Sequence, residues 1–190
     1  MKDWDQHYRN ALLATPSPSP LLQDYSYLLP RQGRALDLAC GRGGNALLLA
    51  GRGLDTHAWD SSAVAIAQLD SLSAQQGLLV HGVCRDVIHH PPAPTSFDVI
   101  VVSRFLHRPL CPALSAALRP GGLLFYQSFL RQRRDTQQGP TRGEFLLEEG
   151  ELLTLFATLQ LRLYREEGLG GDLSRGERNE AWLIAQRPYQ

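Results

Sequence analysis

The sequence predicts an α/β fold built on a mainly parallel sheet. Apolar runs typical of strands alternate with segments of helical periodicity along most of the 190 residues, as in consecutive strand–helix–strand units. The run at 97–102 is continuously apolar and β-branched, which indicates a central strand buried on both faces. The last two strand-like runs, at 160–166 and 181–187, have no helix between them and predict a terminal strand pair.

Composition narrows the class of protein. Hydrophobic residues make up 43% and charged residues 20% of the chain, which is enough apolar material for the packed core of one domain spanning 1–190. A formal net charge of zero argues against nucleic acid as a partner, because such proteins carry a basic surface. No apolar run approaches the ~18 residues of a membrane span, so no membrane partner is expected.

Cysteine usage and the N-terminus predict a cytoplasmic location. The three cysteines are Cys40, Cys84 and Cys111, an odd number without a Cys-x-x-Cys pair, so neither a disulfide framework nor a zinc site is indicated. The first five residues are too polar for a secretory signal.

The N-terminal segments precede the first strand. Residues 1–14 carry Trp4, Tyr8, Leu12 and Leu13 at helical spacing. A proline-rich linker at 15–20 follows, and then a second helical pattern at 21–29 that Pro30 ends. We expect these two helices either to cover the sheet or to close over a ligand.

The middle of the chain alternates regularly. Strands are expected at 34–39, 54–59 and 78–84. The helix at 45–51 is a crossover between the first two strands. A helix ending near Gln76 begins at Ser61 or Ser62, either of which is a suitable N-cap, and Gly77 ends it.

The second half continues the pattern and then becomes irregular. Beyond the strand at 97–102, a helix is expected at 112–118, a turn at 119–122 and a strand at 123–127. The stretch at 131–143 is polar, basic and irregular, and a helix is expected at 148–159.

The first strand runs directly into a glycine turn and a helix, in residues 34–45. Such a unit brings bare backbone and a helix N-terminus up to a ligand, and Asp60 follows at about the ~20-residue distance of a ribose-binding carboxylate. The pattern predicts a nucleotide-like ligand. A nicotinamide dinucleotide is the alternative, but that fingerprint wants a third glycine where Ala46 stands, and a substrate domain for which little chain remains.

Four segments together resemble the class I S-adenosylmethionine-dependent methyltransferases. They are Leu36-Asp37-Leu38-Ala39-Cys40-Gly41-Arg42-Gly43-Gly44-Asn45, His57-Ala58-Trp59-Asp60, Phe97-Asp98-Val99-Ile100 and Leu118-Arg119-Pro120-Gly121-Gly122-Leu123-Leu124. With the Trp4…Tyr8-Arg9 start, the resemblance is to the small tellurite-resistance-type branch. It covers roughly residues 1–165. The family often has glycine where Ala39 stands.

The resemblance implies an architecture and an activity. The fold would be a Rossmann-like three-layer sandwich with a mainly parallel seven-stranded sheet and an antiparallel C-terminal strand. Residues 1–30 would form a helical cover, 31–130 the cofactor-binding core, and 131–190 a lid loop and the terminal strands. The activity would be transfer of a methyl group from S-adenosyl-L-methionine to a small-molecule acceptor, by a monomer or homodimer. A non-catalytic cofactor-binding or adaptor protein is the alternative, because fold alone does not establish activity.

The resemblance also assigns cofactor contacts. The expected cofactor-binding residues are Trp4, Tyr8, Asp37, Ala39, Cys40, Gly41, Gly43, Asn45, Asp60, Ser61, Asp86, Val87 and Ser103. Several have an alternative role. Asp37 would meet the cofactor ammonium or stabilise the turn, and Asp60 would bind ribose or cap the next helix. Asp86 would contact adenine or be solvated, and Trp4 and Tyr8 would close over the cofactor or pack in the core.

The acceptor half of the site has few candidates. His107, just beyond the fourth strand, is the candidate general base, needed only if the acceptor carries a proton with a high pKa. His89 and His90 are adjacent residues beside prolines, a poor chelating pair, so no metal is expected. Arg131, Arg133, Arg134 and Arg142 would form an anion-binding lid or a solvated loop.

Overall fold

The computed structural model describes residues 4–9 and 15–189. Its centre is a seven-stranded sheet in the order β3-β2-β1-β4-β5-β7-β6. Strands β1 to β5 are parallel, and β7 is antiparallel to both of its neighbours, which confirms the predicted fold class. The strands are β1 (Arg34–Leu38), β2 (Asp55–Asp60), β3 (Val80–Cys84), β4 (Phe97–Ser103), β5 (Leu118–Phe129), β6 (Gln160–Arg165) and β7 (Glu180–Gln186).

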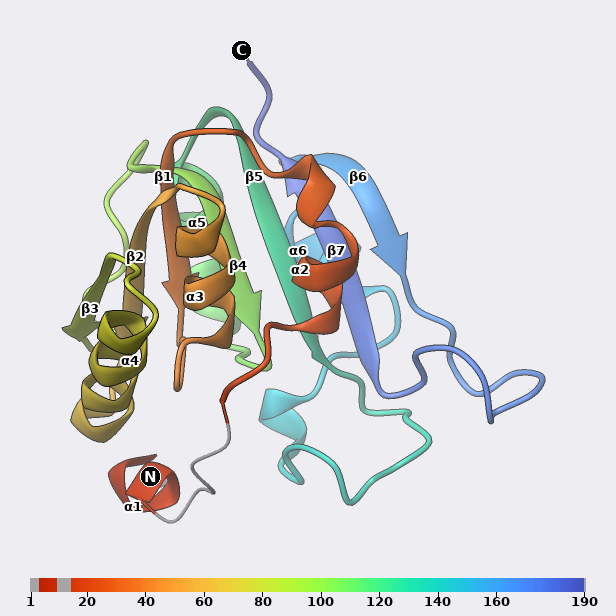
Figure 1. Cartoon of the computed structure of the whole chain (residues 1–190). Helices are drawn as coiled ribbons and strands as arrows, with labels where there is room; N and C mark the ends of the chain where they lie inside the picture. The colour runs from red at the N-terminus through yellow and green to blue at the C-terminus, as the bar shows by residue number, and fades with distance from the viewer. Residues whose placement is uncertain (1–3, 10–14, 190) are drawn as a thin grey trace.

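Helices cover both faces of this sheet, giving three layers (Figure 1). The described α-helices are α1 (Trp4–Arg9), α2 (Pro20–Asp24), α3 (Gly44–Gly51), α4 (Ala63–Gln75), α5 (Cys111–Ala117) and α6 (Glu151–Leu155). Short 3-10 turns lie at Ser26–Leu28, Arg108–Leu110 and Gly143–Phe145. None of the described helices is long and apolar enough to cross a membrane.

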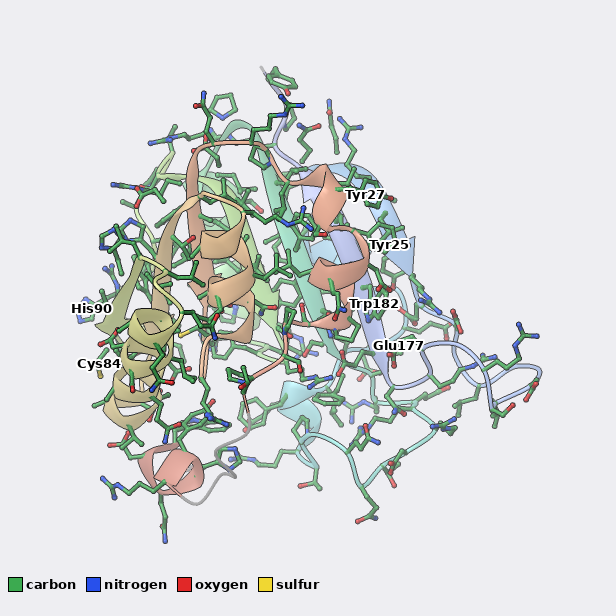
Figure 2. All side chains as sticks on the ribbon, viewed as in Figure 1. Tyr25, Tyr27, Cys84, His90, Glu177 and Trp182 are labelled. Atoms are coloured by element: carbon green, nitrogen blue, oxygen red, sulfur yellow. The ribbon has the colours of Figure 1, made fainter. Side chains whose placement is uncertain are left out.

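Alternating strand side chains build a core on each face of the sheet, because successive residues point to opposite faces. On one face, Val99 and Val101 of β4 pack with Leu22 of α2 and Leu49 of α3. Figure 2 shows Trp182 of β7 below Tyr25 on this side. On the other face, Ile100 and Val102 join residues of α5 and α6. Both faces of β4 are buried, as its continuous apolar run predicts.

Some helices are shorter than the sequence predicts. The pattern at 21–29 forms the five-residue α2 and a separate 3-10 turn, since the chain leaves helical geometry at Tyr25. The pattern at 148–159 forms a helix only at Glu151–Leu155, because Gly150 before it is left-handed, with φ +71°, and Phe156 after it leaves helical geometry, with φ −117°. The pattern at 1–14 is described only as α1; Leu12 and Leu13 lie outside the described residues.

The turn predicted at 119–122 is an irregularity inside β5. Phe97 pairs with Leu118 but Val99 pairs with Leu123, so four residues of β5 bulge out between the two pairs. Gly121 lies in this bulge with φ +80°. The turn signal therefore correctly marks a break in regular pairing, but the strand continues on both sides of it.

The parallel strands end at one edge of the sheet. In Figure 1 the arrowheads of β1 and β4 point toward this edge, where α1 and the segment 131–150 also lie. Ligands of open α/β sheets collect at the carboxyl ends of the strands. The fold therefore gathers the glycine turn, the end of β2 and the N-terminal helix in one place.

Candidate functional site

The glycine turn joins β1 to α3 through three residues with positive φ. These are Ala39 at 55°, Gly41 at 53° and Gly43 at 79°. The Cys40 N–H donates to the Trp59 carbonyl at 3.0 Å, which fastens the turn to the end of β2. The turn therefore lies between two parallel strand ends, with α3 beginning directly behind it.

Ala39 is the position where the chain departs from the usual glycine. Its φ of 55° lies in the left-handed region, which costs an L-residue roughly 1–2 kcal/mol. Its methyl group packs against the core on the α5 side of the sheet. The turn is therefore locally strained at Ala39, and strain of this kind concentrates at ligand sites.

Asp37 lies beneath the turn with 1% of its surface exposed. Its Oδ2 accepts the Ala46 N–H at 3.0 Å, and its Oδ1 accepts from Asn45 Nδ2 at 3.3 Å. Burial raises the pKa of Asp37 to about 7 despite these two bonds. Asp37 therefore stabilises the turn, and a nearby cation would favour its ionised form.

Asn45 has a second partner outside the turn. Its Oδ1 accepts the Ser19 N–H at 2.8 Å. Ser19 is the N-cap of α2, so this bond joins the N-terminal segment to the helix behind the turn. The sequence assigned Asn45 to the cofactor, and the structure shows that its side chain also connects α2 to Asp37.

Asp60 is the last residue of β2 and is 6% exposed. Its Oδ2 accepts the Gly41 N–H at 2.8 Å and its Oδ1 accepts the Ser62 N–H at 2.9 Å. Burial raises the pKa of Asp60, and these backbone N–H groups lower it. An ionised carboxylate has about four acceptor positions, so Asp60 keeps acceptor capacity for hydroxyl groups of a ligand.

The N-cap of α4 is Ser62, one of the two expected residues. Ser62 Oγ accepts the Ala65 N–H at 3.1 Å. Asp60 therefore leaves the capping role to Ser62, although it holds the Ser62 backbone. The neighbouring Ser61 is exposed, and its carbonyl accepts from the Cys84 thiol at 3.5 Å.

Helix α1 covers the turn from outside. Asp5 accepts from Ser62 Oγ at 2.6 Å, and the Tyr8 carbonyl accepts from Gln68 Nε2 at 3.1 Å. A Cβ on Gly41 would lie only 2.7 Å from the Tyr8 hydroxyl oxygen. Tyr8 thus touches the turn. Trp4, stacked on Tyr8 with ring centroids 6.2 Å apart, is 41% exposed.

The loop after β3 holds two predicted cofactor-binding residues, Asp86 and Val87, which differ in burial. Asp86 is exposed and accepts from the Ile88 N–H at 2.9 Å and from His89 Nδ1 at 2.7 Å. The hydrogen bonds from His89 lower the pKa of Asp86. Val87 is 6% exposed and belongs to the core. Asp86 therefore orders its own turn, and its contact with adenine stays a prediction.

The end of β4 carries a network that the sequence analysis did not find. Arg104, directly after Ser103, has φ +58°, and its Nε donates to Glu180 Oε1 at 2.6 Å. Glu180 is 3% exposed and also accepts from Gln127 of β5. The sequence shows an acid, Glu180, next to the last strand, but its partners Arg104 and Gln127 lie 76 and 53 residues away in the chain.

His107 and Arg108 follow this network. The His107 carbonyl accepts the Leu110 N–H at 2.9 Å in a 3-10 turn. The His107 ring is half-buried, and its role as a general base stays a prediction. Arg108 binds both oxygens of Glu151, at 2.5 and 2.8 Å, and donates to the Leu146 carbonyl at 2.9 Å. This fork fixes the start of α6 to the 3-10 turn that follows β4.

The arginines at 131–142 are engaged within their own region. Arg133 is 6% exposed and donates to backbone carbonyls, including that of Pro140 at 2.8 Å. Arg131 pairs with Glu148 and Arg142 pairs with Glu144, both at 2.6 Å. Bound in this way, the guanidinium groups stabilise the loop, and an anionic acceptor would have to compete for them.

The residues at the turn fit an adenosyl cofactor. Gly41 and Gly43 add no side chain of their own to the turn, and Tyr8 and Leu69 lie close to their Cα atoms. The buried carboxyl of Asp37, with its raised pKa, suits a cationic ammonium, and Asp60 keeps free acceptor positions for ribose hydroxyls. These two carboxyl groups lie on neighbouring strands, one beneath the turn and one beyond it. This arrangement can bind a ligand that carries a cationic group at one end and hydroxyl groups at the other.

Comparison with known proteins supports the resemblance. Residues 35–122 match the model of the methyltransferase domain, a segment that runs from β1 to the bulge in β5. Together with the fold, this match agrees with the resemblance to the class I S-adenosylmethionine-dependent methyltransferases. S-adenosylmethionine is the cofactor of this class.

Solved structures share the whole fold. TehB from Haemophilus influenzae superposes with a TM-score of 0.73 at 20% identity, covering 97% of this chain and 67% of that one. Coclaurine N-methyltransferase bound to N-methylheliamine and SAH superposes with a TM-score of 0.69 at 15% identity, covering 87% of this chain and 71% of that one.

A sequence relative is the protein named hemagglutinin 1 of Eikenella corrodens. It is 32% identical over 142 residues, which are 70% of this chain and 46% of that protein. The chain thus spans about half the length of this curated relative.

Proposed function

We propose that this chain transfers a methyl group from S-adenosylmethionine to a small-molecule acceptor. The observation that carries the proposal is the pair of buried carboxyl groups, Asp37 and Asp60, on either side of a glycine turn at the ends of β1 and β2. The TehB-like fold agrees with the tellurite-resistance-type branch, and coclaurine N-methyltransferase, of similar fold, is bound to the small molecules N-methylheliamine and SAH.

Each residue of the pair has a distinct proposed role. Asp60 accepts hydrogen bonds from the ribose hydroxyls, while the Gly41 N–H keeps its carboxylate in position. Asp37 faces the amino-acid portion of the cofactor, and Asn45 holds its Oδ1. Ala39, Cys40, Gly41 and Gly43 supply backbone against the same portion.

Other residues would complete the enclosure. Tyr8 covers the turn and excludes water from it, with Trp4 stacked behind. Ser61, Asp86, Val87 and Ser103 border the adenosyl portion in this proposal.

The chemistry depends mainly on alignment. The bound cofactor supplies a sulfonium whose methyl group is already activated for in-line displacement. The chain orients the acceptor and excludes water, and orientation alone contributes up to ~7–11 kcal/mol to such reactions. His107 would remove a proton from an acceptor that needs it.

The domain and its setting complete the proposal. Residues 1–30 would be the cover, 31–130 the cofactor-binding core, and 131–190 the lid loop and terminal strands of one domain, acting as a monomer or homodimer. Cys40, Cys84 and Cys111 are all free thiols, and burial raises the pKa of Cys111 to about 11. Such thiols suit a reducing cytoplasm.

The decisive experiment measures cofactor binding to the full chain. Thermal unfolding with S-adenosylmethionine, S-adenosylhomocysteine, NAD and NADP should show stabilisation by the first two alone. A ligand at ~100-fold excess over its Kd stabilises by ~2.7 kcal/mol. Stabilisation by NAD alone would contradict the proposal and favour an oxidoreductase.

Variants locate the site within the same assay. Asp60→Asn keeps the size of the side chain but replaces one acceptor oxygen by a donor, so we expect it to lose most cofactor affinity while remaining folded. Asp24→Asn, an exposed acid of α2, is the matched control. Unchanged affinity of Asp60→Asn would refute the ribose assignment.

A product assay then tests catalysis. The chain and S-adenosylmethionine are incubated with thiols, selenium and tellurium oxyanions, amines and phenols, and S-adenosylhomocysteine is measured. Acceptor-dependent release supports the enzyme. Cofactor binding without release in any of these mixtures would favour a non-catalytic cofactor-binding or adaptor protein.

A further inference from the structure

A second group of ligating side chains lies at the opposite end of β2. Asp55 is the first residue of this strand, and His57 is two residues further on, so both side chains point to the same face of the sheet. His81 of β3 stands directly opposite His57 in the parallel register. Sheet pairing thus brings together three residues that are 26 positions apart at their extremes.

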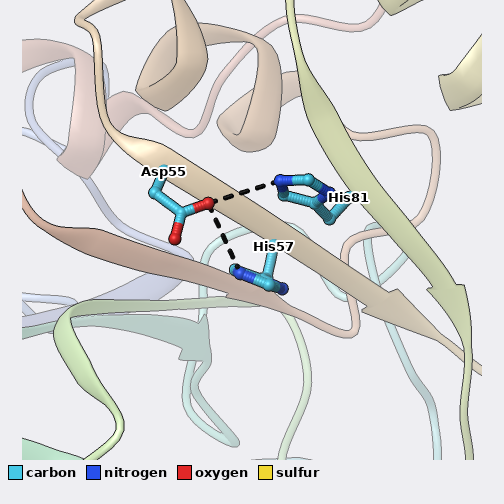
Figure 3. Close-up of side chains that lie close together, drawn as sticks. All are labelled: Asp55, His57 and His81. Atoms are coloured by element: carbon cyan, nitrogen blue, oxygen red, sulfur yellow. Dashed lines mark ion pairs between the residues drawn. The ribbon is translucent and has the colours of Figure 1, made fainter.

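The spacing of the ligand atoms matches a metal polyhedron. Asp55 Oδ1 lies 3.5 Å from His57 Nε2 and 3.4 Å from His81 Nε2, and Figure 3 shows this one oxygen facing both rings. All three atoms lie within 4.8 Å of one another. With Zn–N and Zn–O bonds of about 2.0–2.1 Å, the edges of a tetrahedral zinc site measure about 3.3–3.4 Å.

The surroundings of the cluster prepare it for a cation. Arg34 Nε donates to the other oxygen of Asp55, Oδ2, at 3.0 Å, which orients the carboxylate as outer ligands of metal sites do.

One ligand atom makes no hydrogen bond in the described structure. His57 Nε2 is buried, and Asp55 Oδ1 lies 3.5 Å from it without forming a hydrogen bond. A buried polar atom of this kind calls for an explanation, and a bound cation would supply one. The connection between β3 and β4, residues 85–96, contains no helix. The side chains of Asp55 and His81 are each 45% exposed, so an ion can enter.

We propose that Asp55, His57 and His81 form a binding site for a divalent transition-metal ion of the Zn²⁺ class, with water as the fourth ligand. Two imidazoles and one carboxylate are a common ligand set for Zn²⁺. The site is separate from the cofactor site, because Asp55 and Asp60 are the two ends of one strand, roughly 16 Å apart at ~3.3 Å per residue. A bound ion would tie the edge strand β3 to β2.

The test is metal binding to the full chain, freed of metal by chelation and carrying no histidine tag. Calorimetric titration with Zn²⁺ and visible absorption with Co²⁺ are measured for the wild type and for Asp55→Asn, His57→Gln and His81→Gln. His90→Gln, an exposed histidine outside the cluster, is the control. We expect one tight ion in the wild type and in the control. Each ligand variant should lose at least about 100-fold in affinity, since even outer ligands cost 10–100-fold.

The stability readout separates binding from folding. Zn²⁺ should raise the unfolding temperature of the wild type and of His90→Gln but not that of His81→Gln, whose residue is exposed on the edge strand and tolerates the change. Absence of stoichiometric Zn²⁺ binding by the wild type would overturn the proposal. Equal loss of affinity in His90→Gln and His81→Gln would also overturn it, because it would show scattered surface binding.

Discussion

Gly41→Ala tests the contact between the glycine turn and helix α1. Gly41 has φ +53°, and a Cβ there would lie 2.7 Å from the Tyr8 hydroxyl oxygen and 3.3 Å from Tyr8 Cζ. The substitution therefore has two effects, backbone strain and displacement of Tyr8. Gly77→Ala is a matched control for the first, because Gly77 has φ +65° and nothing within 4 Å of its Cβ position.

The two effects differ in size and in consequence. Left-handed backbone costs alanine roughly 1–2 kcal/mol at either glycine. At Gly41 the hydroxyl must also retreat from 2.7 Å to an ordinary contact of about 3.4 Å, which displaces α1 from the turn. We expect Gly41→Ala to lower the free energy of unfolding by more than Gly77→Ala does and to expose α1 to protease.

The assay is urea unfolding with limited proteolysis and cofactor titration. Tyr8→Phe removes the clashing oxygen, so the double variant Tyr8→Phe/Gly41→Ala should recover toward the level of Gly77→Ala. Gly41→Ala alone should weaken cofactor binding, and Gly77→Ala should not. Equal destabilisation by the two glycine variants, with no recovery in the double variant, would falsify the reasoning.

Two further predictions concern Asp37 and Arg108. Because burial raises the pKa of Asp37 from 3.8 to about 7, the folded state holds a proton that the unfolded chain releases above pH 4. The free energy of unfolding should fall as pH rises from about 4 to about 7, and Asp37→Asn should remove this contribution in pH-dependent urea unfolding. Arg108→Met should lower the free energy of unfolding by about 2 kcal/mol, since hydrogen bonds to charged groups contribute ~1.5–3 kcal/mol. In a double-mutant cycle, the double variant Arg108→Met/Glu151→Gln should be no less stable than Glu151→Gln alone. Additive losses of stability would contradict the pairing.

Much of the fold follows from local patterns. The apolar run of β4, the strand–glycine–helix unit of β1 and α3, and the capped helix α4 are each determined by neighbouring residues, and each forms as predicted. The patterns at 21–29 and 148–159 gave helices that are too long, because periodicity does not show where Tyr25 and Gly150 leave helical geometry. Local sequence therefore determines the type of an element better than its ends.

The candidate site divides in the same way. Asp37, Gly41 and Asp60 could be selected from the sequence because a strand, a turn and the next strand must place them at one edge. The network of Arg104, Gln127 and Glu180 could not, since its members meet only through the pairing of β5 with β7.

The sequence by itself determined the class of fold, the place of the glycine turn and the two carboxylates around it. Only the tertiary structure decided that Ala39 is left-handed, that Tyr8 covers Gly41, and that His57 and His81 face one carboxylate. The physical reason is range: backbone propensity and hydrophobic period act within a few residues, whereas strand register and helix packing join residues far apart in the chain. The expectation of no metal considered only the adjacent histidines His89 and His90. The proposed ion site depends on the register between β2 and β3, which brings His57 and His81 together.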